Sequence, residues 1–398
     1  MHGTFSSGEG GFLYPLYETK LLIIHTTIND TQNMLWWRNG DFYAMSRFFS
    51  NKYNTLTPYT PGEQPKDTKY IKLNTNESPF APSPKAQEMS AKAAQNLQLY
   101  SDPECKALVT LAAKHFGVDT DEILFTNGSD EILNFAFMGY CDNEHPAAFP
   151  DITYGFYSVF AQINNVPYTT IPLKEDFTVD VAEYMNINKT IFLANPNAPT
   201  GIALSVEDIE KIIISNPNNV VVIDEAYVDF GAESVVPLIH KYNNLLVTQT
   251  CSKSRSLAGG RLGFGIGCKE LIQDLNTIKY STNPYNINSM TMAAGVGTFM
   301  DDSYTKENCK IIQEVRAWTM EALKSMDFTM TNSMANFIFA RHKTADGKQI
   351  YLKLKEKGVL IRHFDTKQLS PYNRITVGNK EQMQAFLTAL KEVLEELQ

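Results

Sequence analysis

The feature that most constrains the fold of this chain is the apolar run Val220–Ile223, which ends abruptly in Asp224. All four residues of the run are β-branched, and such an unbroken run is typical of a strand buried on both faces of a parallel sheet. Similar short runs alternate with longer segments of helical spacing, at residues 123–125, 191–193, 245–247 and 264–266. This alternation predicts an α/β fold in which helices cover both faces of a mostly parallel sheet.

The last third of the chain has a different pattern. Helical spacing dominates residues 286–325, and three apolar runs, at 337–339, 359–361 and 374–377, predict strands of a smaller sheet. Apolar residues from Met383 to Leu397 then fall on one face of a closing amphipathic helix. We therefore expect an arm at 45–80, a large domain at 81–285 and a small C-terminal α+β domain at 286–398.

Residues 1–44 differ from the rest of the chain. They begin with a Gly/Ser-rich stretch and have no sustained helix or strand period, whereas Met45-Ser46 reads as an ordinary start. Gly40-Asp41 can also be encoded by a purine-rich ribosome-binding sequence. Our hypothesis is that 1–44 is a non-native or disordered extension. The alternative is a docking arm in which Trp36 and Trp37 pack.

Composition narrows the function classes. The chain has 398 residues, 43% of them hydrophobic, and a net charge of −9 with no long basic block, so we expect no nucleic-acid partner. No apolar run is long enough for a membrane span. The five cysteines are scattered, without the spacing of a metal site or a disulfide framework, which favours a reducing, cytoplasmic location.

The segment Thr250–Phe264 carries the strongest chemical signal. It places Lys253 just beyond the apolar run 245–247, and Arg261 follows eight residues later in a glycine-rich turn. A lysine at the end of a buried strand is costly unless it is neutralised or forms a covalent bond, as it does with an aldehyde cofactor. An arginine nearby would bind the phosphate of that cofactor. An exposed basic turn is the alternative.

Further polar groups follow the predicted strands, where ligands bind in open parallel sheets. Ser129, in Asn127–Asp130, suits a phosphate at a helix N-terminus or is a plain N-cap. Asp224 suits a protonated pyridine nitrogen, with Tyr227 beside it for the ring oxygen, or the two are a helix cap and a packed tyrosine. Tyr154 suits a stacked ring or the core.

Together these segments resemble the fold-type-I pyridoxal-phosphate aminotransferases of classes I and II, from Met45 to the C-terminus. The likeness extends to the histidinol-phosphate aminotransferase family, because Leu73–Pro79 matches its Leu-Asn-x-Asn-Glu-x-Pro motif. Tyr100 in Leu99–Pro103 and Arg374 in Arg374–Gly378 match as well.

The resemblance implies pyridoxal 5′-phosphate as cofactor, a mostly parallel seven-stranded sheet, and a role for each matching residue. Lys253 binds the cofactor aldehyde and moves the proton, Asp224 pairs with the ring nitrogen, Tyr227 binds the ring oxygen and Tyr154 stacks on the ring. The cofactor phosphate is held by Gly128, Ser129, Asp130, Ser252, Arg261 and the partner subunit's tyrosine at position 100, Tyr100. The substrate is held by Arg374 and Asn76 and, at its phosphate, by Arg362, Tyr59 and Tyr285, with both tyrosines supplied by the partner subunit.

One departure concerns the ring oxygen. The family usually has Asn directly before Pro-Thr-Gly, and this chain has Ala198 there. Asn197 or Asn195 replaces that side chain, or Tyr227 binds the oxygen alone; we choose Asn197.

The implied reaction is transamination between L-histidinol phosphate and 2-oxoglutarate in a homodimer, with small-molecule substrates and no metal. Two alternatives within the fold share nearly all cofactor residues: an aromatic-amino-acid aminotransferase and a threonine-phosphate decarboxylase. A catalytically silent ligand-binding relative is the alternative from a different class.

Overall fold

The computed structural model describes residues 35–38, 41–44, 46–65 and 69–397. The chain divides into a unit ending at Asn54 and a unit over Thr55–Gln398. In the first unit, strands β1 (Leu35–Arg38) and β2 (Asp41–Ala44) form an antiparallel pair, and a short 3-10 helix spans Asn51–Tyr53. The hypotheses about residues 1–34 and about Met45 as the start concern residues outside those described.

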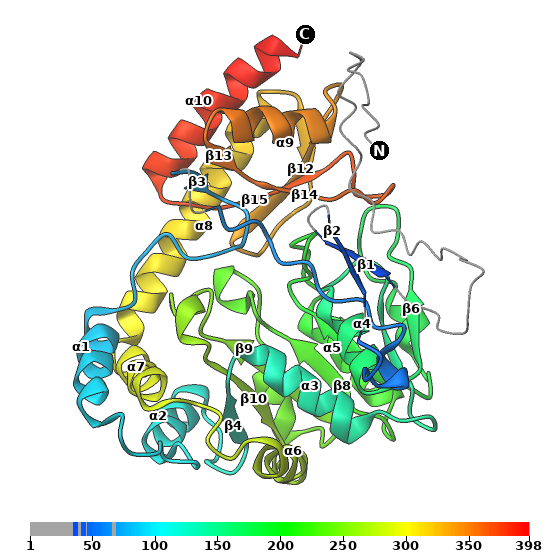
Figure 1. Ribbon diagram of the computed structural model, residues 1–398, viewed down its shortest axis with the longest axis vertical. Helices are drawn as coiled ribbons and strands as arrows, with labels where there is room; N and C mark the ends of the chain where they lie inside the picture. Colours follow the sequence, from blue (N-terminus) through cyan, green and yellow to red (C-terminus); the bar gives the residue numbers. More distant parts are fainter. Residues whose placement is uncertain (1–34, 39–40, 45, 66–68, 398) are drawn as a thin grey trace, which may run out of the picture. The chain divides into compact units, whose positions relative to one another are not determined.

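A seven-stranded sheet forms the centre of the second unit, with strand order β4-β10-β9-β8-β7-β5-β6 (Figure 1). Every neighbouring pair is parallel except the two that involve β10, which runs antiparallel to β4 and β9. The strands are β4 (Ile123–Thr126), β5 (Ala147–Pro150), β6 (Tyr168–Ile171), β7 (Thr190–Ala194), β8 (Val221–Asp224), β9 (Leu245–Thr250) and β10 (Gly263–Gly267). The predicted mostly parallel seven-stranded sheet is confirmed.

The local sequence explains these elements. All residues of β8 and β9 are buried, as expected for central strands covered on both faces. Helix α5 starts at Val206, because the Ser205 hydroxyl caps it by accepting from the Asp208 N–H at 3.1 Å. The helices of this part of the chain are α1 (Pro84–Ala93), α2 (Lys106–Phe116), α3 (Ser129–Tyr140), α4 (Phe156–Ile163), α5 (Val206–Ser215) and α6 (Lys269–Thr282).

A four-stranded antiparallel sheet, in the order β11-β12-β15-β14, lies with α9 (Gly347–Glu356) and α10 (Lys380–Glu396) in the C-terminal part (Figure 1). Its strands are β11 (Phe328–Met330), β12 (Phe337–His342), β14 (Arg362–His363) and β15 (Asn373–Thr376). The run 359–361 was predicted to join this sheet, and that is wrong. Its strand β13 (Val359–Leu360) instead pairs in parallel with β3 (Ile71–Lys72), because the arm lies alongside it. The chain enters the small sheet only at β14, Arg362–His363.

The large sheet has an apolar core on each of its faces, and the small sheet has a core of its own. Ile312, Ile375 and Phe386 belong to the core of the small sheet, which includes α8 (Asp302–Lys324), α9 (Gly347–Glu356) and α10 (Lys380–Glu396). Helix α7 (Ser289–Met300) packs in the core of the large sheet against α1, although the predicted boundary at 286 places it in the small domain. Within the described residues, no helix is both long and apolar enough to cross a membrane.

Candidate active site

The predicted site residues gather at one edge of the large sheet. Asp224 is the last residue of β8, Lys253 lies three residues beyond the end of β9, and Gly128 lies two residues beyond β4. These three strands point the same way, so the loops that follow them meet at one edge. Arg374, on β15 of the small sheet, also lies close to this edge. Its positive charge is near enough to affect the pKa of both Lys253 and Tyr227.

Lys253 is half-buried, and its amine has a lowered pKa. Its Nζ donates to the backbone carbonyl of Thr75 at 3.3 Å and lies 6.0 Å from the centre of the Tyr227 ring. Burial, followed by the positive charge of Arg374, lowers the pKa of Lys253 to about 8. An amine with this pKa is deprotonated in part near neutral pH, which is the form that attacks an aldehyde.

Asp224 is a carboxylate with little access to water, since only 4% of it is exposed. Burial raises its pKa to about 7, and a hydrogen bond from Tyr157 opposes that rise. The Tyr157 hydroxyl donates to Asp224 Oδ2 at 3.0 Å, and the Ala226 N–H donates to Oδ1 at 3.2 Å. The sequence analysis missed Tyr157; its place one helical turn beyond Tyr154 is the signal that could have revealed it.

Tyr154, Asp130 and Arg261 form a chain of polar contacts beside Asp224. The Tyr154 hydroxyl donates to Asp130 Oδ1 at 2.7 Å, and Arg261 Nη2 donates to Asp130 Oδ2 at 3.1 Å. Burial raises the pKa of Tyr154 well above its usual value, so the phenol stays protonated. The Asp130 carboxylate therefore orients Arg261. Of the polar groups of Asp130, only the backbone N–H, in the first turn of α3, is suited to an anion.

The turn that leads into α3 is closely packed around Gly128. Gly128 has a φ of +84°, and a Cβ there would lie 2.6 Å from Arg261 Nη2. A Cβ at Gly263, on the neighbouring strand, would lie 2.1 Å from the Ser129 nitrogen. Both positions therefore require glycine. Ser252 is buried nearby and accepts from the Thr250 hydroxyl at 3.0 Å.

The Tyr227 hydroxyl has a partner from the arm. Asn76 Nδ2 donates to it at 2.9 Å, and Asn76 is itself fixed by Thr376, whose hydroxyl accepts from its N–H at 2.9 Å. Asn197 has no such role here, because its amide binds Ile152 O, Thr200 Oγ1 and Thr153 Oγ1. The side chain of Ala198 packs against Tyr227. Of the two asparagines, the structure brings Asn76 to Tyr227.

Two arginines lie opposite each other on neighbouring strands of the small sheet. Arg362 on β14 is the direct partner of Arg374 on β15 in the strand register. Like charges opposite each other are unfavourable, and the charge of Arg362 lowers the pKa of Arg374, whose largest lowering comes from burial. Among the described residues, Arg374 Nε and Thr75 Oγ1 are buried atoms without a hydrogen-bond partner. The two arginines are suited to anionic ligands.

The three predicted tyrosines fall in two places. Tyr59 stacks on Phe156 at 4.3 Å and lies 6.4 Å from Tyr154, with 40% of it exposed. Tyr100 and Tyr285 instead stack on each other at 4.6 Å, and 84% of Tyr100 is exposed.

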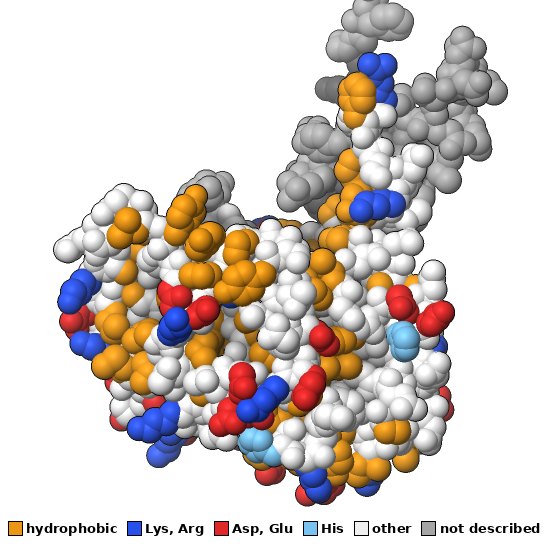
Figure 2. Space-filling view, turned by 90° about the horizontal axis from the view of Figure 1, so that it is seen from below, with side chains coloured by type: hydrophobic (Ala, Val, Ile, Leu, Met, Phe, Trp, Pro, Cys, Tyr) orange, Lys and Arg blue, Asp and Glu red, His pale blue; other side chains and the backbone are white. Residues whose placement is uncertain are grey.

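Exposed apolar side chains accompany this tyrosine pair. Leu97 and Leu99, close to Tyr100 in the sequence, are also more than half exposed. Figure 2, which looks at the molecule from below the view of Figure 1, shows hydrophobic side chains gathered in patches between charged groups on the side that it draws. Patches of this kind often mark contact surfaces.

The site residues fit the cofactor that the resemblance implies. A pyridine nitrogen needs an acid or carboxylate partner, and Asp224 is a buried carboxyl at this edge. A phosphate needs convergent donors, and Arg261, the N-terminal turn of α3 and Ser252 supply them around a glycine that leaves no room for a Cβ. Lys253 supplies an amine whose lowered pKa suits an aldehyde.

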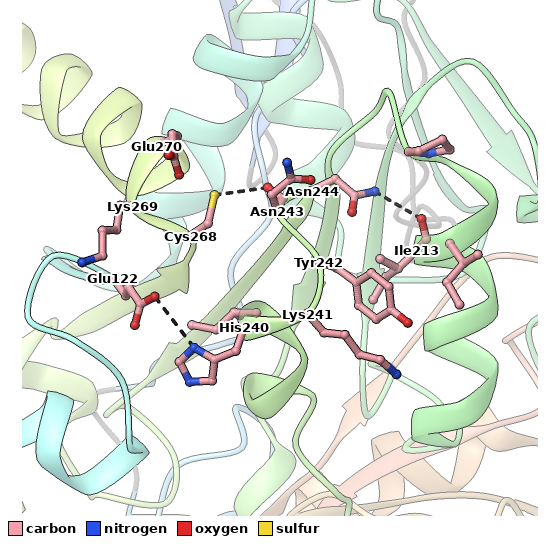
Figure 3. A pocket seen from close by; sticks show the side chains of 13 residues that line it. Glu122, Ile213, His240, Lys241, Tyr242, Asn243, Asn244, Cys268, Lys269 and Glu270 are labelled. Atoms are coloured by element: carbon pink, nitrogen blue, oxygen red, sulfur yellow. Dashed lines mark hydrogen bonds and ion pairs between the residues drawn. The ribbon is translucent and has the colours of Figure 1, made fainter.

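A separate cleft of about 720 Å³ lies at the opposite edge of the large sheet, near the start of β9 and the end of β10. Figure 3 shows His240 facing Glu122 and the Cys268 thiol directed at the Asn243 carbonyl. The His240–Glu122 distance is 3.8 Å and the Cys268–Asn243 distance is 3.2 Å. None of the predicted site residues lines this cleft.

Comparison with known proteins identifies the family of this chain. Residues 68–390 match the family described as aminotransferase class I and II. A histidinol-phosphate aminotransferase of Brachyspira hyodysenteriae is 46% identical over 352 residues, which cover 88% of this chain and 99% of that protein. Its counterpart in Marinomonas sp. is 46% identical over 351 residues, which cover 87% of this chain and 99% of that protein.

A solved structure shares the fold. The histidinol-phosphate aminotransferase of Sinorhizobium meliloti, in complex with pyridoxal-5′-phosphate, has a TM-score of 0.81 at 23% identity, covering 89% of this chain and 99% of that one. The chain therefore belongs to the class I and II aminotransferases and, among them, to the family of histidinol-phosphate aminotransferases.

Proposed function

We propose that this protein is a pyridoxal-phosphate-dependent transaminase that converts L-histidinol phosphate and 2-oxoglutarate into imidazole-acetol phosphate and glutamate. The observation that carries this proposal is the register of Arg362 opposite Arg374, next to the low-pKa amine of Lys253. Two cations held side by side are costly unless anionic groups neutralise them. A phosphorylated amine supplies one anionic group and a dicarboxylate supplies two, so both substrates suit the pair.

The residues divide into those for the cofactor and those for the substrates. When bound, pyridoxal 5′-phosphate supplies an electrophilic aldehyde carbon and a ring that accepts the electron pair left on the substrate's α-carbon. Asp224 holds the proton on the ring nitrogen, and Tyr227, supported by Asn76, donates to the ring oxygen. Ser129, Ser252 and Arg261 bind the phosphate, together with the backbone of Gly128 and Asp130, and Tyr154 lies against the ring.

Lys253 moves the proton. Its Nζ takes the proton from the substrate's α-carbon in the unprotonated form, which a pKa of about 8 leaves available near neutral pH. Arg374 orients the substrate so that this carbon faces Nζ. The neighbouring charge of Arg374 also keeps the pKa of Lys253 low, so one side chain serves both binding and proton transfer.

Arg362 and Tyr59 are the groups that we assign to the substrate's phosphate. Tyr59 acts on its own chain's site, because it lies beside Tyr154 there. Tyr100 and Tyr285 form an exposed stacked pair, which supports a homodimer in which they complete the partner's site. The five unpaired cysteines favour a cytoplasmic protein.

A half-reaction tests the proposal. The aldehyde form of the enzyme is mixed with L-histidinol phosphate, L-histidinol or L-phenylalanine, and the cofactor absorbance is followed. We expect rapid conversion by histidinol phosphate alone. Equal rates with unphosphorylated histidinol would refute phosphate recognition, and faster conversion by phenylalanine would favour an aromatic aminotransferase.

A further inference from the structure

We propose that Glu131 and Asn286 link the cofactor-phosphate loop of one site to the tyrosine pair that completes the other site of the dimer. This inference rests on the proposed function, which assigns Gly128–Asp130 to a chain's own site and Tyr100 with Tyr285 to its partner's. Glu131 and Asn286 are positioning residues in this scheme, since neither touches a substrate.

The link is a single carboxylate oxygen with two donors. Glu131 Oε2 accepts from the Asn127 N–H at 2.7 Å and from Asn286 Nδ2 at 2.6 Å. The first bond is expected of a glutamate in the first turn of a helix, where it ties down a free N–H. The second is not, because it joins residues 155 positions apart in the sequence. Asn286 is 8% exposed, so its amide would be costly to leave unbonded.

The tyrosine pair is attached to the segment that contains Asn286. Asn286 directly follows Tyr285, and the next residue, Ile287, accepts from the Ser101 hydroxyl at 2.6 Å. Ser101 in turn directly follows Tyr100. Both tyrosines are therefore fixed through their immediate neighbours to residues 286–287, and that segment is fixed to the phosphate loop through Glu131.

The exposure of the pair shows why it needs such support. In the single chain, 84% of Tyr100 and 44% of Tyr285 are exposed, and the two rings stack on each other. Stacking alone stabilises an aromatic pair weakly, so it fixes poorly a side chain that must meet a ligand in another subunit. The partly buried Asn286–Glu131 bond adds a constraint and ties the pair to the phosphate loop.

A mixed dimer separates this role from general damage. One chain carries Tyr100→Ala and the other carries Lys253→Ala, so the only complete site combines the lysine of the first with the tyrosine of the second. Asn286→Ala is then added to either chain. On the Lys253→Ala chain it disturbs the tyrosine pair of the complete site, and we expect kcat/KM for histidinol phosphate to fall about tenfold. On the Tyr100→Ala chain it should change nothing.

The cofactor affinity of homodimers gives a second readout. Glu131→Ala should weaken the binding of pyridoxal 5′-phosphate more than Asn286→Ala does, because it frees the Asn127 N–H in addition to the Asn286 amide. Glu131→Gln, which retains an acceptor oxygen, is the matched control and should restore most of both properties. Thermal unfolding verifies that each variant is folded.

The outcomes are distinct. If the mixed dimer lacking any Asn286 change regains no activity, the shared site is wrong and this inference falls with it. If activity returns but Asn286→Ala acts equally on both chains, or on neither, only the link through Glu131 is refuted.

Discussion

Asp224→Asn should make the cofactor-free protein more stable at alkaline pH while destroying its activity. The carboxyl has a pKa of about 7 in the fold against 3.8 for the ordinary group, and burial is the main cause. The native state therefore binds this proton more tightly than the unfolded chain does. Stability is lost as the pH rises from about 4 to about 7, and the full cost remains above that.

The size of the effect follows from the shift. Each pKa unit corresponds to about 1.4 kcal/mol, so moving from 3.8 to about 7 costs about 4 kcal/mol at pH 8. An asparagine at the same place has no charge to bury. We therefore expect the unfolding free energy of the apoprotein variant to exceed that of the wild type by a margin that grows from pH 4 to pH 7 and then levels off.

Denaturant unfolding of both apoproteins at a fixed protein concentration, from pH 4 to pH 8, measures this margin. Asp208→Asn is the control, because Lys211 lowers the pKa of that carboxyl and the margin should not rise with pH. Saturation with pyridoxal 5′-phosphate should shrink or reverse the difference at Asp224, since the protonated ring nitrogen then compensates the charge. A margin at Asp224 that is flat with pH would refute the reasoning.

Three further substitutions test the site. Lys253→Ala should abolish turnover yet leave non-covalent cofactor binding, measured by spectroscopic titration; turnover at the wild-type rate would contradict the assignment. Tyr157→Phe removes a donor to Asp224 and should raise its pKa, so kcat should drop about tenfold at pH 7 and less at pH 9, whereas a pH-independent loss would indicate a packing role. Arg362→Ala should lower kcat/KM for histidinol phosphate, with a loss of about 2–5 kcal/mol in binding free energy, and should leave the absorbance spectrum of the resting enzyme unchanged. An unchanged kcat/KM would show that Arg362 does not bind the phosphate.

The architecture was readable from local patterns. Runs such as Val220–Ile223, which are short, continuous and β-branched, are typical of strands buried on both faces of a sheet. Their alternation with helical segments implies a parallel sheet, and a parallel sheet gathers its following loops at one edge. The contents of those loops, Lys253 and Asp224 above all, then pointed to a site, and the resemblance named the chemistry.

The pairing of strand 359–360 was not readable in this way. A short apolar run carries no information about its neighbour, and only the returning arm at Ile71 decided that it leaves the small sheet. Register is likewise a property of two strands together, so the placement of Arg362 opposite Arg374 required the folded sheet.

What the sequence by itself determined is the kind of fold and the identity of the reactive groups, because hydrophobic period and residue chemistry are local. What only the tertiary structure decided is which polar side chains hold those groups in place. Tyr157 on Asp224, Asn76 on Tyr227 and Glu131 on Asn286 each join residues 67 or more positions apart. A hydrogen bond depends on distances of tenths of an ångström between such residues, and these distances are set by the packing of the whole chain.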